Sequence, residues 1–257
     1  MLCEVSIKAI PNIPDILPND DINFIICESI ALSNIELVDG DIICVAHKIF
    51  SKAEGCIINL SNVKPSEKAL YYAKKLNKDP RKVQVILNES KNVIRYFKHS
   101  GQNEGVMICE HKLGFISANA GVDQSNIEGI DNVITLPKDP DLSSSRLRVA
   151  LETKFNTRIG VVMTDTFGRP WRIGQVNIAI GLAGVPATIK EQGNKDAYGR
   201  PLLVTEPAFS DEISAASGLL ANKSGKKPVI LFRGLKWQEK NSNARDILRI
   251  EREDVFK

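Results

Sequence analysis

The chain has 257 residues, of which 43% are hydrophobic and 25% are charged, and its 34 basic and 31 acidic residues leave a net charge of +3. This composition excludes disordered, collagenous and disulfide-scaffold proteins. The weak charge bias argues against a dedicated nucleic-acid binder, which would carry a strong basic excess. The length allows one large domain or two small lobes.

Membrane and secretion signals are absent from the sequence. No apolar run approaches the ~20 residues that a membrane span requires, and the N-terminus shows no signal-peptide pattern. The five cysteines form no C-x-x-C pair, and several stand inside apolar runs. We therefore expect a cytoplasmic protein with buried, free thiols.

Strand-like runs rich in Val and Ile alternate with amphipathic segments, which predicts an α/β or α+β fold. The expected strands are Leu2–Ile10, Ile42–Ile49, Val106–His111, Asn132–Leu136, Ile159–Thr164, Val176–Ile180 and Val229–Arg233. The expected helices carry prolines, caps or acidic first turns, and begin at Pro65, Asp79, Asp139 and Asp211. The charged tail from Lys236 to Lys257 is predicted to be a solvated helix.

Three polar stretches interrupt these elements, and the first is Ser117–Gly129. It follows a strand-like segment and places the carboxylate of Asp123 three residues before the amide of Asn126. Such a pair fits a site for Mg²⁺ or Mn²⁺ beside a phosphate. Taken alone, it is more typical of a turn whose side chains bind their own backbone.

The second stretch is Met163–Gly174. A buried strand is expected to end near Asp165 and Thr166, and ligands of α/β proteins bind at the carboxyl ends of strands. Arg169 and Arg172 flank a rigid proline and suit a phosphate or carboxylate. The alternative is a capping role for Asp165 with both arginines on a solvated face.

The third stretch, Phe50–Gly55, contains Lys52, which would neutralise phosphate charge or simply lie in solvent. Neither a G-x-x-x-x-G-K-S/T nor a G-x-G-x-x-G motif occurs, which argues against P-loop and Rossmann nucleotide sites. His47 stands in an apolar run, where a buried structural histidine is commoner than a ligand. No serine-hydrolase elbow or activated cysteine is present.

Together the polar blocks resemble the coenzyme F-420:L-glutamate ligase family. The matching blocks are Asp39–Ile43, Ser51–Gly55, Asn119–Asn126, Thr164–Gln175, Asn177–Gly184, Asp196–Leu202 and Asp211–Ile213. They follow the family order over nearly the whole chain. The resemblance implies a two-lobed mixed-sheet subunit, neither Rossmann nor P-loop, that forms one catalytic unit over residues 1–257. It also implies an intertwined homodimer, and we expect no fused C-terminal flavin domain.

The resemblance implies GTP-dependent amide formation on the deazaflavin precursor coenzyme F-420-0. The precursor carboxylate would take the γ-phosphate of GTP, and the amine of L-glutamate would then displace phosphate from the acyl phosphate. The expected cofactors are Mg²⁺ or Mn²⁺, as two divalent ions, together with K⁺. The expected partners are small molecules and a second copy of the chain, with no nucleic acid and no membrane.

The resemblance also assigns roles to residues. It implies metal ligation by Asp123, Asp165 and Thr166, and we assign catalytic contacts to Arg169 and Arg172. The implied nucleotide contacts are Ile13, Pro14, Asp15, Ile16, His47, Lys52, Asn126, Asn222, Lys223, Ser224 and Gly225. Lys223 stands where some relatives supply an acidic ligand to the second metal.

Two alternatives remain open at this stage. One is a metal-dependent phosphohydrolase that uses Asp123 and Asp165. The other is a nucleotide- or deazaflavin-binding protein without catalysis, which the departures at His47 and Lys223 would favour.

Overall fold

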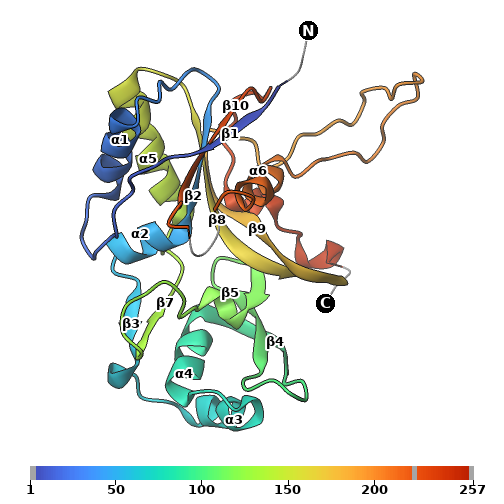
Figure 1. The fold of residues 1–257 in the computed structure, drawn as a ribbon. Coiled ribbons are helices and arrows are strands. Elements are labelled where there is room, and N and C mark those ends of the chain that lie inside the picture. The colour runs from blue at the N-terminus through green and yellow to red at the C-terminus, as the bar shows by residue number, and fades with distance from the viewer. Residues whose placement is uncertain (1–3, 222–224, 255–257) are drawn as a thin grey trace.

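Two hydrophobic cores organise the chain, one above the other in Figure 1. The computed structural model describes residues 4–221 and 225–254. The chain enters the lower part after α2 (His47–Ala53) and returns to the upper part before α5 (Pro140–Phe155). The lower part is therefore an insertion between two elements of the upper part.

A five-stranded mixed sheet forms the centre of the upper part, in the order β1-β10-β2-β8-β9. Its strands are β1 (Ser6–Ala9), β10 (Val229–Arg233), β2 (Ile42–Ala46), β8 (Gly160–Arg169) and β9 (Arg172–Ala183). Only β2 and β8 pair in parallel, and the other neighbours are antiparallel. This arrangement confirms the predicted α+β class.

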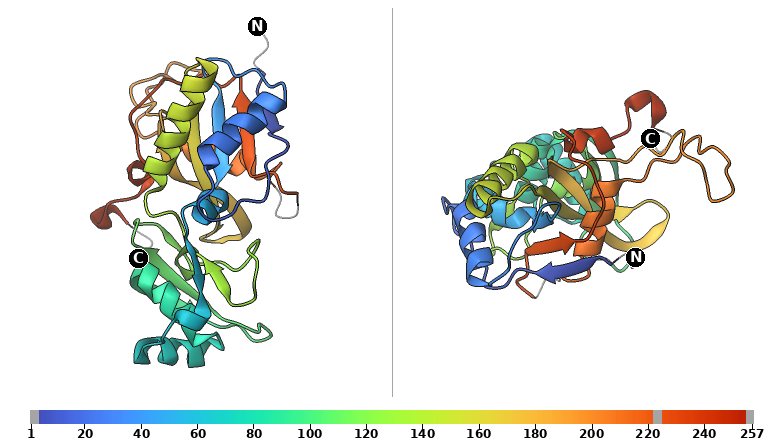
Figure 2. Two further views of the ribbon diagram at one scale, coloured as in Figure 1. Left: turned by 90° about the vertical axis from the view of Figure 1, so that its left-hand side faces the viewer. Right: turned by 90° about the horizontal axis from the view of Figure 1, so that it is seen from above.

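Helices cover both faces of this sheet. α1 (Ile22–Leu32) and α5 lie on one face, and α6 (Phe209–Ser217) lies on the other (Figures 1 and 2). Leu147 and Leu151 of α5 are fully buried, as their spacing predicts. None of the helices in the described ranges is both long and apolar enough to cross a membrane.

The outer edge of β9 is covered by two carboxylates. Asp141, in the first turn of α5, accepts a hydrogen bond from the backbone N–H of Leu182. Asp211, in the first turn of α6, accepts one from Ala179. Burial raises the pKa of both acids. The paired donors leave less of this edge open to another strand.

The lower part consists of a two-stranded ribbon, a three-stranded sheet, two α-helices and two short 3-10 helices. Its strands are β3 (Ile57–Asn59), β4 (Ser90–Phe97), β5 (Val106–His111), β6 (Ile116–Ala118) and β7 (Asn132–Ile134). Its helices are η1 (Leu60–Asn62), α3 (Glu67–Leu76), α4 (Pro80–Glu89) and η2 (Asn119–Gly121). β3 pairs with β7, and β5 lies between β4 and β6.

The expected strand over Ile42–Ile49 is wrong in its second half. β2 stops at Ala46 and α2 begins at His47, because parallel pairing with β8 ends where Ala46 meets Thr164. The predicted strand ends at Thr164 and Val176 are also wrong. β8 and β9 continue as a long hairpin, so Asp165 lies inside a strand.

Other boundaries differ from the sequence prediction as well. Ser66 caps α3, with its hydroxyl accepting from the N–H of Ala69, so Pro65 lies outside that helix. The described part of the tail after Lys236 contains only short 3-10 turns, η3 (Ala244–Ile247) and η4 (Glu251–Glu253), instead of a helix. α1 and β4 have no counterpart among the expected elements.

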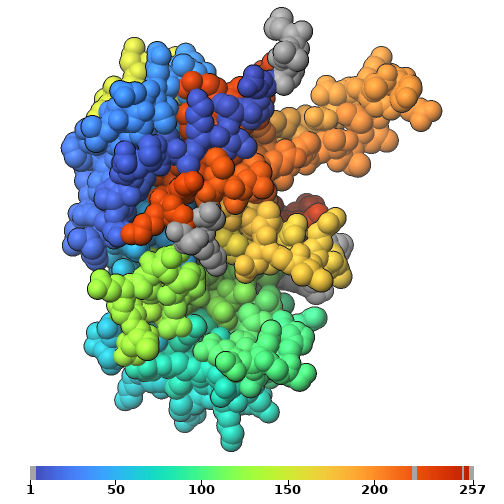
Figure 3. Space-filling model, in the orientation of Figure 1, coloured from blue at the N-terminus to red at the C-terminus, as the bar shows by residue number. Residues whose placement is uncertain are grey.

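A long arm projects from the upper part between β9 and α6 (Figures 1 and 3). Its two sides are joined by backbone hydrogen bonds, including Ile189 N–H to Pro207 and Leu202 N–H to Asn194. Leu203 and Val204 on the arm are 76% and 84% exposed. The arm therefore presents apolar side chains away from the body of its own chain.

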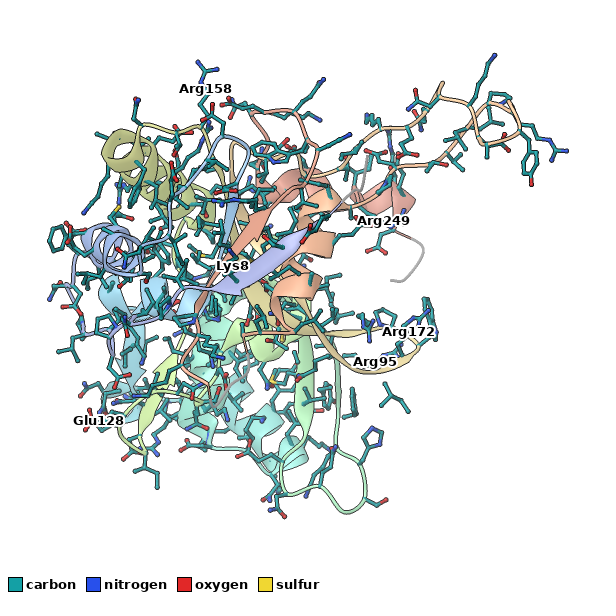
Figure 4. All side chains as sticks on the ribbon, turned by 45° about the horizontal axis from the view of Figure 1, so that its top comes forward. Lys8, Arg95, Glu128, Arg158, Arg172 and Arg249 are labelled. Atoms are coloured by element: carbon teal, nitrogen blue, oxygen red, sulfur yellow. The ribbon has the colours of Figure 1, made fainter. Side chains whose placement is uncertain are left out.

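We predict that Arg233→Ala lowers the free energy of unfolding by about 3–5 kcal/mol, because it leaves a buried carboxylate unpaired. Arg233 donates from Nε and Nη2 to the two oxygens of Asp41, which is 1% exposed. Urea unfolding would measure the change. Arg158→Ala is the control, since Arg158 points into solvent (Figure 4); an equal loss in both variants would contradict the prediction.

Candidate functional site

A cavity of about 440 Å³ lies where β2, β8 and β9 meet α2 and the η2 loop. Most of the predicted site residues line it, although they come from separate stretches of sequence. These are Ile13, Pro14, Asp15, Ile16, His47, Lys52, Asp123, Asn126, Asp165 and Thr166. The fold thus brings the three motif regions to one cavity.

Some predicted residues lie elsewhere. Arg169 and Arg172 face each other at the end of the β8–β9 hairpin, where both are exposed, and they do not line the cavity. Figure 4 shows Arg172 at that hairpin, beyond the body of the upper part. Gly225 is also outside the lining. Asn222, Lys223 and Ser224 fall outside the described residues.

Strand register places Asp165 beside His47. Ala46, the last residue of β2, pairs with Thr164 of β8, so the residues that follow each are neighbours. The Nε2 atom of His47 lies 3.2 Å from Oδ1 of Asp165, and its Nδ1 atom lies 3.0 Å from Oγ of Ser51. All three side chains are buried or nearly so.

A second hydrogen-bonded chain holds Thr166. The hydroxyl of Ser217 donates to the carbonyl of Ser214, so its oxygen accepts from Nδ2 of Asn177. This orients Oδ1 of Asn177 toward Thr166, whose hydroxyl donates to it at 2.9 Å. With its proton committed, the Thr166 oxygen can offer only lone pairs to a ligand in the cavity.

Asp123 is held by an ammonium group that sequence reasoning missed. Lys48 Nζ lies 2.5 Å from Oδ2 of Asp123, and the Ser125 hydroxyl donates to the same oxygen. Burial alone would raise the pKa of Asp123, but the hydrogen bonds from Lys48 and Ser125 outweigh it and hold the pKa well below its usual value. Asp123 is therefore a carboxylate at neutral pH.

Lys48 could have been recognised from helical spacing. In α2, Lys48 and Lys52 are four residues apart, as are His47 and Ser51, so each pair shares one side of the helix. The sequence prediction ended a strand at Ile49, so Lys48 fell in the strand and Lys52 in the stretch after it, and the helical spacing of the pair was not recognised. Both lysines line the cavity.

Further positive charge comes from Lys226 and Lys227, which also line the cavity. Lys226 Nζ lies 2.8 Å from Oδ2 of Asp15. The hydrogen bond from Lys226 lowers the pKa of Asp15, and the charge of Lys52 adds to this effect. Ammonium groups from two distant segments therefore face the same opening, as a phosphate-bearing ligand requires.

The Asn126 backbone adopts φ = 60°, and Gly121 adopts φ = 69°. Left-handed backbone suits Asn and Gly far better than most residues. A side chain at Gly121 would also press on Leu136, with a Cβ only 3.0 Å from its Cγ. These residues therefore fix the tight path of the loop that carries Asp123.

Cys44 lines the cavity but is chemically quiet. It is 1% exposed, and burial raises its pKa to about 12. A thiol in this state is not a nucleophile at neutral pH. The four cysteines within the described residues are free and buried, as expected from the sequence.

The donor set suits a hard cation bound together with phosphate. The carboxylates of Asp123 and Asp165 and the hydroxyl of Thr166 are among the groups that line the cavity. No group of three or more His, Cys, Asp or Glu residues that could hold a metal exists in the part of the chain that the structure describes. Mg²⁺ commonly takes only one or two protein carboxylates and completes its shell with phosphate and water. The residues present thus fit a metal–nucleotide site better than a closed all-protein metal site.

The fold and the site together define a class of protein. It is an α+β protein with a mixed sheet and a cavity lined by oxygen ligands and ammonium groups. The family model described as F420-0:Gamma-glutamyl ligase matches residues 11–234, and the chain belongs to this family.

Relatives named "Coenzyme F420:L-glutamate ligase" agree with this assignment. The protein of Methanocaldococcus jannaschii is 40% identical over 220 residues, covering 85% of each chain. That of Methanopyrus kandleri is 38% identical over 98% of this chain and 97% of its own. That of Methanothermobacter thermautotrophicus is 36% identical over 98% of this chain and 99% of its own.

We predict that Asp165→Asn abolishes catalytic turnover and leaves the unfolding temperature close to that of the wild type. The amide keeps the side-chain volume but removes the charge that a divalent cation requires. Asp131→Asn is the matched control, because Asp131 is 48% exposed and pairs with Arg81 away from the cavity. Wild-type turnover in Asp165→Asn would contradict the assignment of Asp165 as a metal ligand.

Proposed function

We propose that the chain ligates L-glutamate to coenzyme F-420-0 with GTP as the phosphoryl donor. The observation that supports this best is the gathering of Asp123, Asp165 and Thr166 with Lys48 and Lys52 around one cavity. Membership of the ligase family and the names of the relatives supply the substrates.

The proposed reaction has two steps. A carboxylate oxygen of the precursor attacks the γ-phosphorus, and the β–γ bridging oxygen leaves with GDP, which gives an acyl phosphate. The amine of L-glutamate then attacks the acyl carbon, loses a proton and expels inorganic phosphate, forming the amide. Phosphoryl transfer depends mostly on positioning and charge neutralisation.

The residues of the cavity have distinct parts in this scheme. The ammonium groups of Lys48, Lys52 and Lys226 would bind the triphosphate, and residues 13–16 would lie against the guanine nucleoside. Asp123, Asp165 and Thr166 would hold Mg²⁺ or Mn²⁺, as two ions, with K⁺ as a further cofactor. Bound divalent ions would neutralise charge on the β- and γ-phosphates.

Arg169 and Arg172 keep their proposed catalytic role under one condition. Because both lie at the hairpin end and outside the cavity lining, they can reach a substrate only beyond this cavity or in a second copy of the chain. A guanidinium at either position suits the carboxylate or phosphate groups of the precursor.

The test is one incubation followed by mass spectrometry. Protein, GTP, Mg²⁺ or Mn²⁺, L-glutamate and coenzyme F-420-0 are mixed, and we expect the precursor to grow by glutamate units with one GDP formed per unit. GDP and phosphate without glutamate addition would favour the phosphohydrolase. Nucleotide binding without any turnover would favour the inactive binding protein.

We also propose that the working form is a homodimer joined through the arm. Leu203 and Val204 on the arm and Ile173 on the β8–β9 hairpin are almost wholly exposed, which is costly for apolar side chains unless another surface covers them. A second copy is the partner that the family resemblance implies.

The corresponding prediction concerns mass in solution. Leu203→Glu combined with Val204→Glu should halve the mass measured by light scattering, because two charges would enter the covered apolar contact. Lys190→Glu, an exposed change near the base of the arm, is the control and should leave the mass unchanged. A wild-type mass of one chain would contradict the dimer.

A further inference from the structure

His47 lines the cavity, but both nitrogens of its imidazole face partners within the protein. The residue is 2% exposed, and each ring nitrogen already has a partner within the protein, Ser51 for Nδ1 and Asp165 for Nε2. A ring engaged on both sides has no donor or acceptor left for a ligand. Its position beside the cavity therefore calls for an indirect role.

The direction of these hydrogen bonds follows from chemistry. A carboxylate only accepts, so a proton shared between His47 and Asp165 is carried by Nε2 of the ring. In the neutral ring with this tautomer Nδ1 accepts, and the hydroxyl of Ser51 donates to it. The proton donors thus follow one direction, from Ser51 to His47 and from His47 to Asp165, and the series ends on a single carboxylate oxygen.

That oxygen is Oδ1, and two nitrogens approach it. The N–H of Thr166 donates to Oδ1 at 2.7 Å, and Nε2 of His47 lies 3.2 Å from it. No hydrogen bond between described residues reaches Oδ2 of Asp165. Turning the carboxylate would break both contacts, so its orientation is fixed with one oxygen committed to the protein and the other left for a cation.

We propose that His47 is a positioning residue that orients Asp165 for a divalent cation, with Ser51 fixing the imidazole. This inference rests on the proposed function, in which Asp165 is a metal ligand. Residues that hydrogen-bond to a metal ligand and orient it commonly change the metal affinity about 10–100-fold when they are mutated. His47 acts through Asp165 and does not touch the nucleotide.

A matched control exists in the lower part of the molecule. His111 is 3% exposed, its Nδ1 accepts the N–H of Leu113, and its Nε2 lies 3.5 Å from Oε2 of Glu89. It is therefore a second buried histidine whose Nδ1 is hydrogen-bonded and whose Nε2 lies near a carboxylate, although this Nε2 makes no hydrogen bond within the described residues. Neither His111 nor Glu89 lines the cavity.

The experiment measures Mn²⁺ binding by water-proton relaxation, which reports ions held on a slowly tumbling protein. The full chain is titrated with Mn²⁺ alone and with GTP, and GTP binding is measured separately without metal. We expect His47→Leu to raise the Mn²⁺ dissociation constant about 10–100-fold without changing metal-free GTP binding. His111→Leu should leave Mn²⁺ binding unchanged.

Two further variants keep the test decisive if His47→Leu does not fold. His47→Gln places an amide N–H where the Nε2 proton stood and should retain most of the Mn²⁺ affinity. Ser51→Ala should lower that affinity, by less than His47→Leu, because the ring loses only its second anchor. Retained Mn²⁺ affinity in His47→Gln together with a loss of affinity in Ser51→Ala would support a positioning role.

The outcomes separate this inference from the function on which it rests. Wild-type protein that binds no Mn²⁺ in either condition would overturn both the metal site and the role of His47. Wild-type binding that is unchanged in His47→Leu and Ser51→Ala would overturn the positioning role alone. Loss of metal-free GTP binding in His47→Leu, with Mn²⁺ binding intact, would show instead that His47 is a nucleotide contact.

Discussion

The parallel pairing of β2 with β8 is the constraint on which the site depends. Both strands are buried at the centre of the upper sheet, and their register ends with Ala46 opposite Thr164. The chain then leaves β2 into α2 while β8 continues, so a helix start comes to lie against the middle of a strand. His47 and Asp165 meet for this reason, and the lysines of α2 face the same cavity.

Much of the molecule was predictable where local chemistry and tertiary structure agree. The strands Val106–His111 and Val229–Arg233 match the sequence prediction at both ends, since short apolar runs bounded by polar residues have few other solutions. Asp79 and Asp139 cap their helices as predicted, each followed by proline. The family resemblance placed Asp123 and Asp165 in one site, and both residues line the cavity.

The remaining features depend on contacts that no local pattern reveals. The run from Ile42 to Phe50 is almost continuously apolar, so the spacing of its apolar residues does not distinguish a strand from a helix. Because the boundary between β2 and α2 was not recognised, Lys48 was not identified as a site residue. β4 is mostly exposed and bulged against β5, which removes the alternation that marks a strand. The pairing of His47 with Asp165 needed the strand register itself.

α2 also constrains how this chain can change in length. Its seven residues carry the hydrogen-bonded pair His47 and Ser51 and the cavity-lining pair Lys48 and Lys52, each one turn apart. One inserted residue would rotate everything after it by about 100°, which would separate both pairs while leaving β2 and β8 intact. Insertions and deletions in α2 would thus disrupt the site without disrupting the sheet. The arm and the hairpin end, in contrast, can vary in length without rotating the side chains of α2. The number of residues in α2 therefore sets the directions in which its side chains point. Its length should be as strictly maintained as the identity of those side chains.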